Sequence, residues 1–226
     1  MTWYDDAAGP TRGERIELSA RVLANWTAKA ANLLVDELDV EPGDEVVLAL
    51  PTHWRALYWS LAAWSAGAVV VVPDGVGDLP SRARVLVVSG ATADLAEGAD
   101  ADAVVAVSLP ALSRGWTEGP LPAGAVDEAA VLTGQGDVFV PVTDPGRLGP
   151  ALRTATGSWT SAGLVAAARE AASGLPDGAR VLREEGPAGA VRLLAPWTVD
   201  GSLVLVRDPD PQLLDARLRA EQVVAG

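Results

Sequence analysis

Apolar side chains recur at steps of three and four residues between residues 22 and 38, and this period predicts an amphipathic helix with one buried stripe. Ser19 precedes the helix and belongs to the residue types that cap helix N-termini, while Leu18 can pack against Leu23. Lys29, the only lysine in the sequence, falls on the polar side and is expected to face solvent without a catalytic role. The stripe consists of Val22, Leu23, Trp26, Ala30, Leu33, Leu34 and Leu38.

After this helix the pattern changes to runs of branched apolar residues. In "VEPGDEVVLAL" the Pro-Gly pair suits a type II turn, and residues Val46 to Leu50 predict a buried strand. A helix over Trp54–Ala66 and a strand over Ala68–Val72 complete a strand–helix–strand unit, which implies parallel strands. The uncharged run from Ala56 to Val72 is about the shortest that crosses ~30 Å of hydrocarbon. The glycine before its valines nevertheless favours a helix and a buried strand over a membrane span.

The middle of the chain has a weaker pattern. Two further strands are predicted over Arg84–Ser89 and Ala103–Ser108, joined by the short acidic helix "ATADLAEGADAD". Residues 109–159 are rich in proline and glycine, which favours loops, with one strand predicted over Asp137–Val142.

The pattern of the first hundred residues returns near the end of the chain. "SARVLANW" is echoed by "SAGLVAAA", "EPGDEVVL" by "LPDGARVL", and residues 61–74 by residues 194–208, in the same order. We therefore expect an α/β fold of two pseudo-repeated lobes, each a mostly parallel sheet flanked by helices. The expected division of this single domain, residues 1–226, is lobe 1 over about 1–108, a linker and middle region over about 109–159, and lobe 2 over about 160–226. The alternative is that unrelated αβ units share alanine, leucine and Pro-Gly turns.

Composition narrows the classes of function. The net charge of −13 argues against binding to nucleic acid or to anionic membranes. The sequence has no cysteine and a single histidine, so we expect no disulfide, no thiolate nucleophile and no Cys- or His-based metal site, while a carboxylate site for Mg²⁺ stays open. The first residues, "MTWYDDAAGPTRGER", lack the basic start and apolar core of a secretory signal, which favours a cytoplasmic protein.

The stretch "ELSARVLANWTAKAANLLVDELDVEPGDEVVLALPTHWRALYWSLAAWSAGAVVVVPD" resembles the opening of the adenylate-forming AMP-binding enzymes, which include acyl-CoA synthetases, peptide adenylation domains and luciferases. The tail from Thr160 resembles the family's segment after its phosphate-binding loop, and the whole is most similar to a short actinobacterial group of unknown function. The resemblance implies two related α/β lobes. Its matching positions are Asn32-Leu33, Val40 to Val46, Pro51, Ala66-Gly67-Ala68 and Pro73.

The chain also departs from this family. The family's phosphate loop is rich in Ser, Thr and Gly and ends in Pro-Lys-Gly, but here the lysine position falls on Ala155 within "RTATGSWTS". The family's adenosine-binding segment and its C-terminal subdomain, with the adenylation lysine, would lie beyond Gly226. The resemblance therefore implies a truncated, degenerate relative that serves as a ligand-binding or protein-interaction module, without catalytic residues or a resident cofactor. Two alternatives stay open: residual binding of ATP, AMP or acyl-CoA, and an AMP-forming acyl or aminoacyl ligase completed by a separate chain.

Two places are candidates for a binding site. The degenerate phosphate loop could hold an anion at the start of the following helix, although simple capping by Thr160 or Ser161, with Trp159 packing beside them, explains the same residues. His53 follows a buried strand, where a loop at the carboxyl edge of a parallel sheet can reach a ligand crevice, but a structural role is the alternative. The loop candidates are Thr154, Thr156, Gly157, Ser158, Thr160 and Ser161.

The last helix carries one apolar face, and we expect the protein to form a homodimer or to bind a protein partner through the C-terminal lobe. The alternative is that this face simply covers the strand Ser202–Val206. The apolar positions are Leu213, Leu214, Leu218 and Val224.

Overall fold

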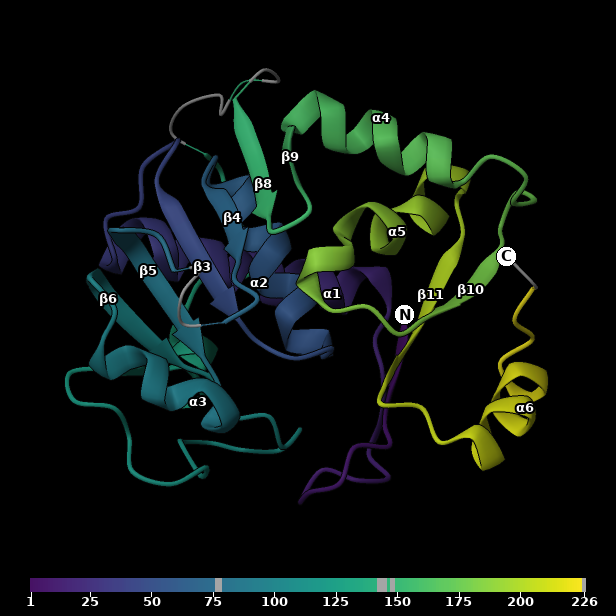
Figure 1. The fold of residues 1–226 in the computed structure, drawn as a ribbon, viewed down its shortest axis with the longest axis horizontal. Helices are drawn as coiled ribbons and strands as arrows, with labels where there is room; N and C mark the ends of the chain where they lie inside the picture. Colours follow the sequence, from purple (N-terminus) through teal and green to yellow (C-terminus); the bar gives the residue numbers. More distant parts are fainter. Residues whose placement is uncertain (76–78, 142–145, 147–148, 225–226) are drawn as a thin grey trace.

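The computed structural model describes residues 1–75, 79–141, 146 and 149–224 (Figure 1). Helices α1 (Ala20–Asn32) and α2 (Trp54–Ser65) occupy the centre, with one sheet on each side. Side chains of both helices and of both sheets join in one hydrophobic core, which includes Trp3 and Leu205 from one sheet and Leu48 from the other. The expected α/β fold is confirmed, with two mixed, mostly parallel sheets flanked by helices.

The larger sheet has the strand order β7-β6-β5-β3-β4-β8-β9, and all neighbouring strands are parallel except β8 and β9. Its strands are β3 (Glu45–Ala49), β4 (Val69–Val72), β5 (Ala83–Val88), β6 (Ala101–Ala106), β7 (Val126–Asp127), β8 (Pro150–Thr154) and β9 (Gly157–Thr160).

The smaller sheet has the order β10-β11-β1-β2, with only β2 antiparallel. Its first two strands in the chain come from residues 2–17, so the two sheets do not follow the division expected from the sequence. The strands are β1 (Thr2–Asp5), β2 (Arg15–Glu17), β10 (Arg180–Arg183) and β11 (Ser202–Arg207).

Helical segments follow most of these strands. Ser19 caps α1 by accepting a hydrogen bond from the Val22 amide, 3.2 Å away, as its residue type predicted. Val22 itself is exposed rather than part of the buried stripe. The remaining helices are the π-helical turn η1 (Leu33–Glu37), α3 (Glu128–Val131), α4 (Ser161–Ala171), α5 (Ala190–Leu194), α6 (Pro211–Ala220) and the 3-10 helices η3 (Gly90–Glu97), η4 (Leu132–Gly134), η5 (Pro187–Gly189) and η6 (Ala195–Val199).

The echoed sequence words adopt the same elements in the same order. One set is α1, β3, α2 and β4, and the other is α4, β10, α5 with η6, and β11. The turns before β3 and β10 make similar hydrogen bonds. Gly43 N donates to Gly67 O over 2.9 Å, and Gly178 N donates to Val199 O over 2.7 Å. Both glycines have positive φ, 95° and 75°, which explains why each turn uses glycine.

The strand predicted over Asp137–Val142 is wrong over residues 137–141, and Val142 lies outside the described residues. Strand β8 takes the place beside β4, so this segment has no ladder to join. Val138 and Val140 are each 75% exposed. The Asn32 side-chain amide holds the segment instead, donating to Gly136 O and Val138 O over 2.9 and 3.1 Å.

The uncharged run from Ala56 to Val72 forms most of α2 and all of β4, as its pattern predicted. Within the part of the chain that the structure describes, no helix combines the length and hydrophobicity needed to cross a bilayer.

Candidate functional site

The segment predicted as a degenerate phosphate loop forms a tight β-hairpin that leads into α4. Strands β8 and β9 are antiparallel, and their last pair before the turn is Thr154 with Gly157. The turn therefore consists of two residues, Ala155 and Thr156. The Thr154 hydroxyl accepts a hydrogen bond from Thr156 N over 3.2 Å, and the ring of Trp159 lies so close to Gly157 that an added Cβ would meet it at 2.9 Å. The backbone is therefore folded onto itself rather than open around a ligand.

The other hydroxyls of the loop lie on β9 or at the start of α4. Thr160 is the N-cap of α4, because its side-chain oxygen accepts from Gly163 N over 3.1 Å. Ser161 is the first helical residue, and its amide donates to Gly149 O over 3.0 Å. Ser158 is exposed. The Thr160 hydroxyl therefore caps the helix, and the Ser161 amide bonds to the segment before β8.

His53 lies in the core rather than in an open crevice. It is the N-cap of α2, where Nδ1 accepts from Arg55 N over 3.1 Å, and its ring meets the ring of Trp3 edge to face with centroids 4.2 Å apart. Burial lowers the pKa of His53 well below its usual value, and the charges of Arg55 and Arg207 lower it further, while the Leu109 backbone opposes them. With Nδ1 as acceptor, the neutral ring carries its proton on Nε2.

The space beside His53 is small. The cavity there has a volume of about 10 Å³, which is room for about one water molecule. His53 and the hairpin both follow strands of the larger sheet at their carboxyl ends, but among the described residues no hydrogen bond or ring contact joins them. The two candidates from the sequence therefore do not combine into one site.

A buried polar cluster lies against α2. Arg55 contacts the Glu128 carboxylate at 3.2 Å, and the Tyr58 hydroxyl donates to the same carboxylate. Burial raises the pKa of Glu128, although Arg55 and Tyr58 oppose the shift. Burial also raises the pKa of Tyr58 well above its usual value. Because Glu128 is fully buried, the cluster links α3 to α2 rather than facing a substrate.

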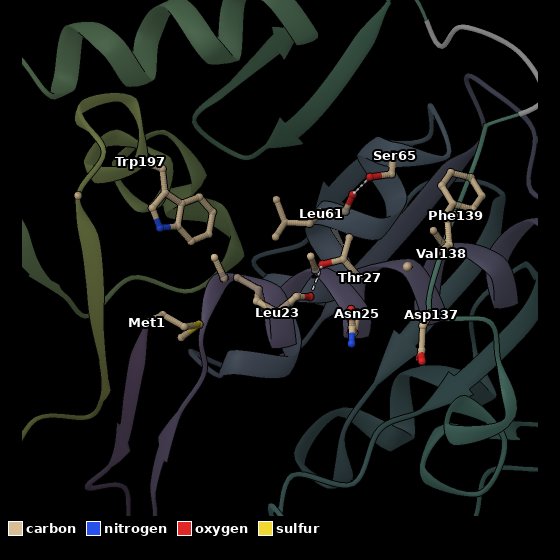
Figure 2. A pocket seen from close by; sticks show the side chains of 15 residues that line it. Met1, Leu23, Asn25, Thr27, Leu61, Ser65, Asp137, Val138, Phe139 and Trp197 are labelled. Atoms are coloured by element: carbon tan, nitrogen blue, oxygen red, sulfur yellow. Dashed lines mark hydrogen bonds between the residues drawn. The ribbon is translucent and has the colours of Figure 1, made fainter. Parts of the chain in front are cut away.

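A cavity with a volume of about 670 Å³ lies along α1 (Figure 2). Its floor is α1 and the end of α2, and its walls come from residues 137–139 and from Trp197 to Gly201. In Figure 2, Trp197 and Phe139 lie toward opposite ends of the group of lining side chains, with Leu61 and Thr27 between them. We name this space the α1 cavity; it is lined by Met1, Ala20, Leu23, Ala24, Asn25, Thr27, Ala28, Ala31, Leu61, Ser65, Asp137, Val138, Phe139, Trp197 and Gly201.

The hydroxyl groups of the α1 cavity are satisfied within their own helices. Thr27 Oγ1 donates to Leu23 O over 2.9 Å, and Ser65 Oγ donates to Leu61 O over 2.8 Å, as Figure 2 shows. Their protons are therefore not available to a ligand.

Lys29 bonds to the segment that forms one wall of the cavity. The expectation that its side chain faces solvent is therefore wrong. Its side chain is only 16% exposed and forms an ion pair with Asp137 at 2.9 Å. The same ammonium group donates to the carbonyl oxygens of Thr133 and Gln135. An ammonium group has three hydrogens, so these three acceptors use all of them. Sequence reasoning missed this role because Lys29 and Asp137 are more than a hundred residues apart.

The C-terminal helix α6 has no buried residue, and Leu213 is 43% exposed. The helix ends at Ala220, so Val224 is not part of it. Leu214 and Leu218 line a cleft of about 300 Å³ together with residues 181–183 of β10. The apolar face of the helix therefore lies toward β10 and does not cover the strand Ser202–Val206. Two carbonyls of β10 already accept hydrogen bonds, Arg180 O from Val224 N and Leu182 O from the Arg183 side chain. Such contacts reduce pairing with another strand. Self-association through this lobe stays a prediction.

Known proteins share this architecture. The family described as AMP-binding enzyme matches residues 4–136. Over 233 residues the chain is 38% identical to a TIGR03089 family protein of Mycobacterium tuberculosis (strain ATCC 25618 / H37Rv), with 99% of this chain and 88% of that protein covered.

Solved structures of longer proteins match in fold. A Brucella canis acyl-CoA synthetase superposes with a TM-score of 0.77 at 19% identity, over 96% of this chain and 42% of that protein. A long-chain-fatty-acid-CoA ligase (FadD1) from Archaeoglobus fulgidus gives 0.74 at 18% identity, over 98% and 46%. The chain spans less than half the length of either enzyme. Because the family match covers more than half of the chain and the mycobacterial relative aligns along nearly all of it, this protein belongs to the AMP-binding enzyme family.

Proposed function

We propose that this chain is a non-catalytic member of the AMP-binding enzyme family that binds a small molecule in the α1 cavity. The observation that carries the proposal is the cavity itself. Its volume of about 670 Å³ falls within the roughly 300–1,000 Å³ of typical ligand pockets. Its lining is mainly apolar, with two aromatic rings and a few polar groups, which is the usual composition of such pockets.

The hairpin supports the non-catalytic part of the proposal. Adenylyl transfer needs positive groups and oriented amides where charge develops, and loss of one such donor commonly costs about 2.7–4 kcal/mol of barrier. Ala155 stands at the tip of the hairpin, where the resemblance places the family's lysine. The nearby cation Arg153 is paired with Glu45 at 2.6 Å. We therefore expect no pyrophosphate exchange by this chain with ATP and carboxylic acids.

The rival function is an AMP-forming ligase completed by a separate chain. Its specific support is the shared fold with an acyl-CoA synthetase and a fatty-acid-CoA ligase. ATP–pyrophosphate exchange, measured with the chain alone and with cell extract from which the chain has been depleted, separates the two functions. Exchange that appears only when both are combined would support the ligase and contradict our proposal.

Binding in the α1 cavity is tested by filling it. Ala24 is exposed on α1 and lines the cavity, so Ala24→Trp adds an indole to the empty space without displacing buried atoms. Ala216→Trp is the matched control, because Ala216 is also exposed in a helix, α6, outside the cavity. In a thermal-shift screen of small molecules, hits that stabilise the wild type and Ala216→Trp but not Ala24→Trp support the proposal. Hits that stabilise all three equally contradict it.

A further inference from the structure

We infer that the α1 cavity accepts an uncharged, mainly apolar molecule and rejects anions, an inference that rests on the proposed function. The lining offers no free cation to an anionic ligand among the described side chains. Asp137 is the one lining residue whose side chain ionises. Its partner Lys29 directs its three hydrogens to Asp137 and to two backbone carbonyls. No ammonium hydrogen of Lys29 is left for the phosphate or carboxylate of a ligand.

Met1 also lines the cavity, and its amino group carries a second titratable charge near it. It donates to Leu18 O over 2.8 Å. Burial lowers the pKa of this amino group, and the charge of Arg180 lowers it further. Its positive charge is therefore weakened, and the net charge of −13 on the whole chain opposes the approach of anions.

Hydrogen bonds within the helices also oppose the binding of an anion. The hydroxyls of Thr27 and Ser65 donate to carbonyls within their own helices, so neither proton can solvate an anion. A carboxylate moved from water into such a cavity would lose its hydration without gaining charged partners. The side-chain amide of Asn25, a neutral group, also lines the cavity and can meet a ligand hydroxyl or carbonyl.

The floor of the α1 cavity is elongated. The lining positions on α1 run from Ala20 to Ala31, and a rise of about 1.5 Å per residue makes this floor about 16 Å long. Apolar side chains follow its whole length, and the rings of Trp197 and Phe139 lie toward opposite ends of the lining in Figure 2. The structure therefore fits an elongated apolar body with one neutral polar group, such as a medium-chain alcohol.

The test compares two ligands of equal chain length and different charge, 1-decanol and decanoate at pH 8. Each is titrated below its aggregation concentration against the neutral dye N-phenyl-1-naphthylamine bound to the protein. Because 1.4 kcal/mol corresponds to a factor of ten and an unpaired carboxylate costs more than that to bury, decanol should displace the dye at a concentration at least about tenfold lower. Decanoate binding equal to or tighter than decanol binding overturns the inference and leaves the proposed function in place.

Two variants complete the experiment. Asp137→Asn removes the negative charge and frees Lys29, so the preference for decanol should shrink, whereas Asp215→Asn on the exposed face of α6 should leave it unchanged. An unchanged preference in Asp137→Asn contradicts the role given to this ion pair. Dye that fails to bind the wild type, or that binds Ala24→Trp equally well, overturns the proposed function together with the inference.

Discussion

Glu221, just after α6, forms ion pairs that connect the end of the described chain to the smaller sheet. Its side chain is 8% exposed and pairs with Arg15 at 3.0 Å and with Arg180. The hydroxyl of Tyr4 donates to the same carboxylate. These partners come from β2, β10 and β1, which include both edge strands of the sheet. We predict that Glu221→Gln destabilises the fold more than the loss of a surface ion pair would.

The pKa of Glu221 gives the magnitude. Burial opposes the charged carboxylate, but hydrogen bonds from Tyr4, Arg180 and Arg15 outweigh it and lower the pKa from 4.5 to about 2. At 1.36 kcal/mol per pKa unit, this shift corresponds to about 3 kcal/mol of stability at neutral pH. Because the folded pKa is depressed, the contribution is complete above pH 4.5 and is lost as pH falls through about 2.

Urea unfolding followed by tryptophan fluorescence measures this contribution. Glu221→Gln should lower the free energy of unfolding by about 3 kcal/mol at pH 7 and by about 1–2 kcal/mol at pH 3, where the wild-type carboxylate loses part of its advantage. The control is Glu17→Gln, because Glu17 is 62% exposed and its one ion pair within the described residues is with Arg15. A deficit of Glu221→Gln that is the same at both pH values, or no larger than that of Glu17→Gln, would refute the electrostatic reasoning.

Three further predictions follow from contacts elsewhere in the fold. Arg55→Met should lower the free energy of unfolding by about 3–5 kcal/mol, because it leaves Glu128 buried without its cation. The double variant with Glu128→Leu should lose less stability than the sum of the two single variants. Additive losses in urea unfolding would contradict the pairing. Thr160→Ala should cost about 1 kcal/mol through loss of the N-cap of α4, and Ser161→Ala clearly less, so equal losses would argue against Thr160 as the cap. Lys29→Met should raise amide hydrogen exchange over residues 133–139, whereas Arg21→Met on the exposed part of α1 should not; unchanged exchange in Lys29→Met would show that the segment is held by other contacts.

The elements that the sequence predicted well are those fixed by local periodicity. The stripe of α1, the valines of β4 and the cap at Ser19 each depend on residues only a few positions apart. The helix–turn–strand units also carry their own turn signals, such as Gly43 and Gly178 at positive φ.

Long-range pairing limited the rest. Nothing local in residues 2–5 indicates that β1 pairs with β11, two hundred residues further along the chain. The Arg55–Glu128 pair joins residues 73 positions apart, and each residue alone reads as an ordinary helical charge. The α1 cavity combines five separate segments: Met1, α1, the end of α2, residues 137–139, and the pair Trp197 and Gly201. Its wall at residues 137–139 was predicted as a strand because the consecutive branched and aromatic residues Val138, Phe139 and Val140 favour one.

The most direct test of ligand binding in the α1 cavity is to locate the bound molecule by nuclear magnetic resonance. In ¹H–¹⁵N spectra of the isotope-labelled protein, 1-decanol should shift the indole N–H of Trp197 and the amides of α1 and of residues 137–139, and these shifts should be absent in Ala24→Trp. ATP with Mg²⁺ should leave the amides of residues 154–161 unshifted, because the hairpin and the start of α4 bond to themselves. Saturable ATP-dependent shifts at residues 154–161, with no decanol-dependent shift at Trp197, would contradict both the proposed absence of nucleotide binding at the hairpin and the proposed binding of a ligand in the α1 cavity.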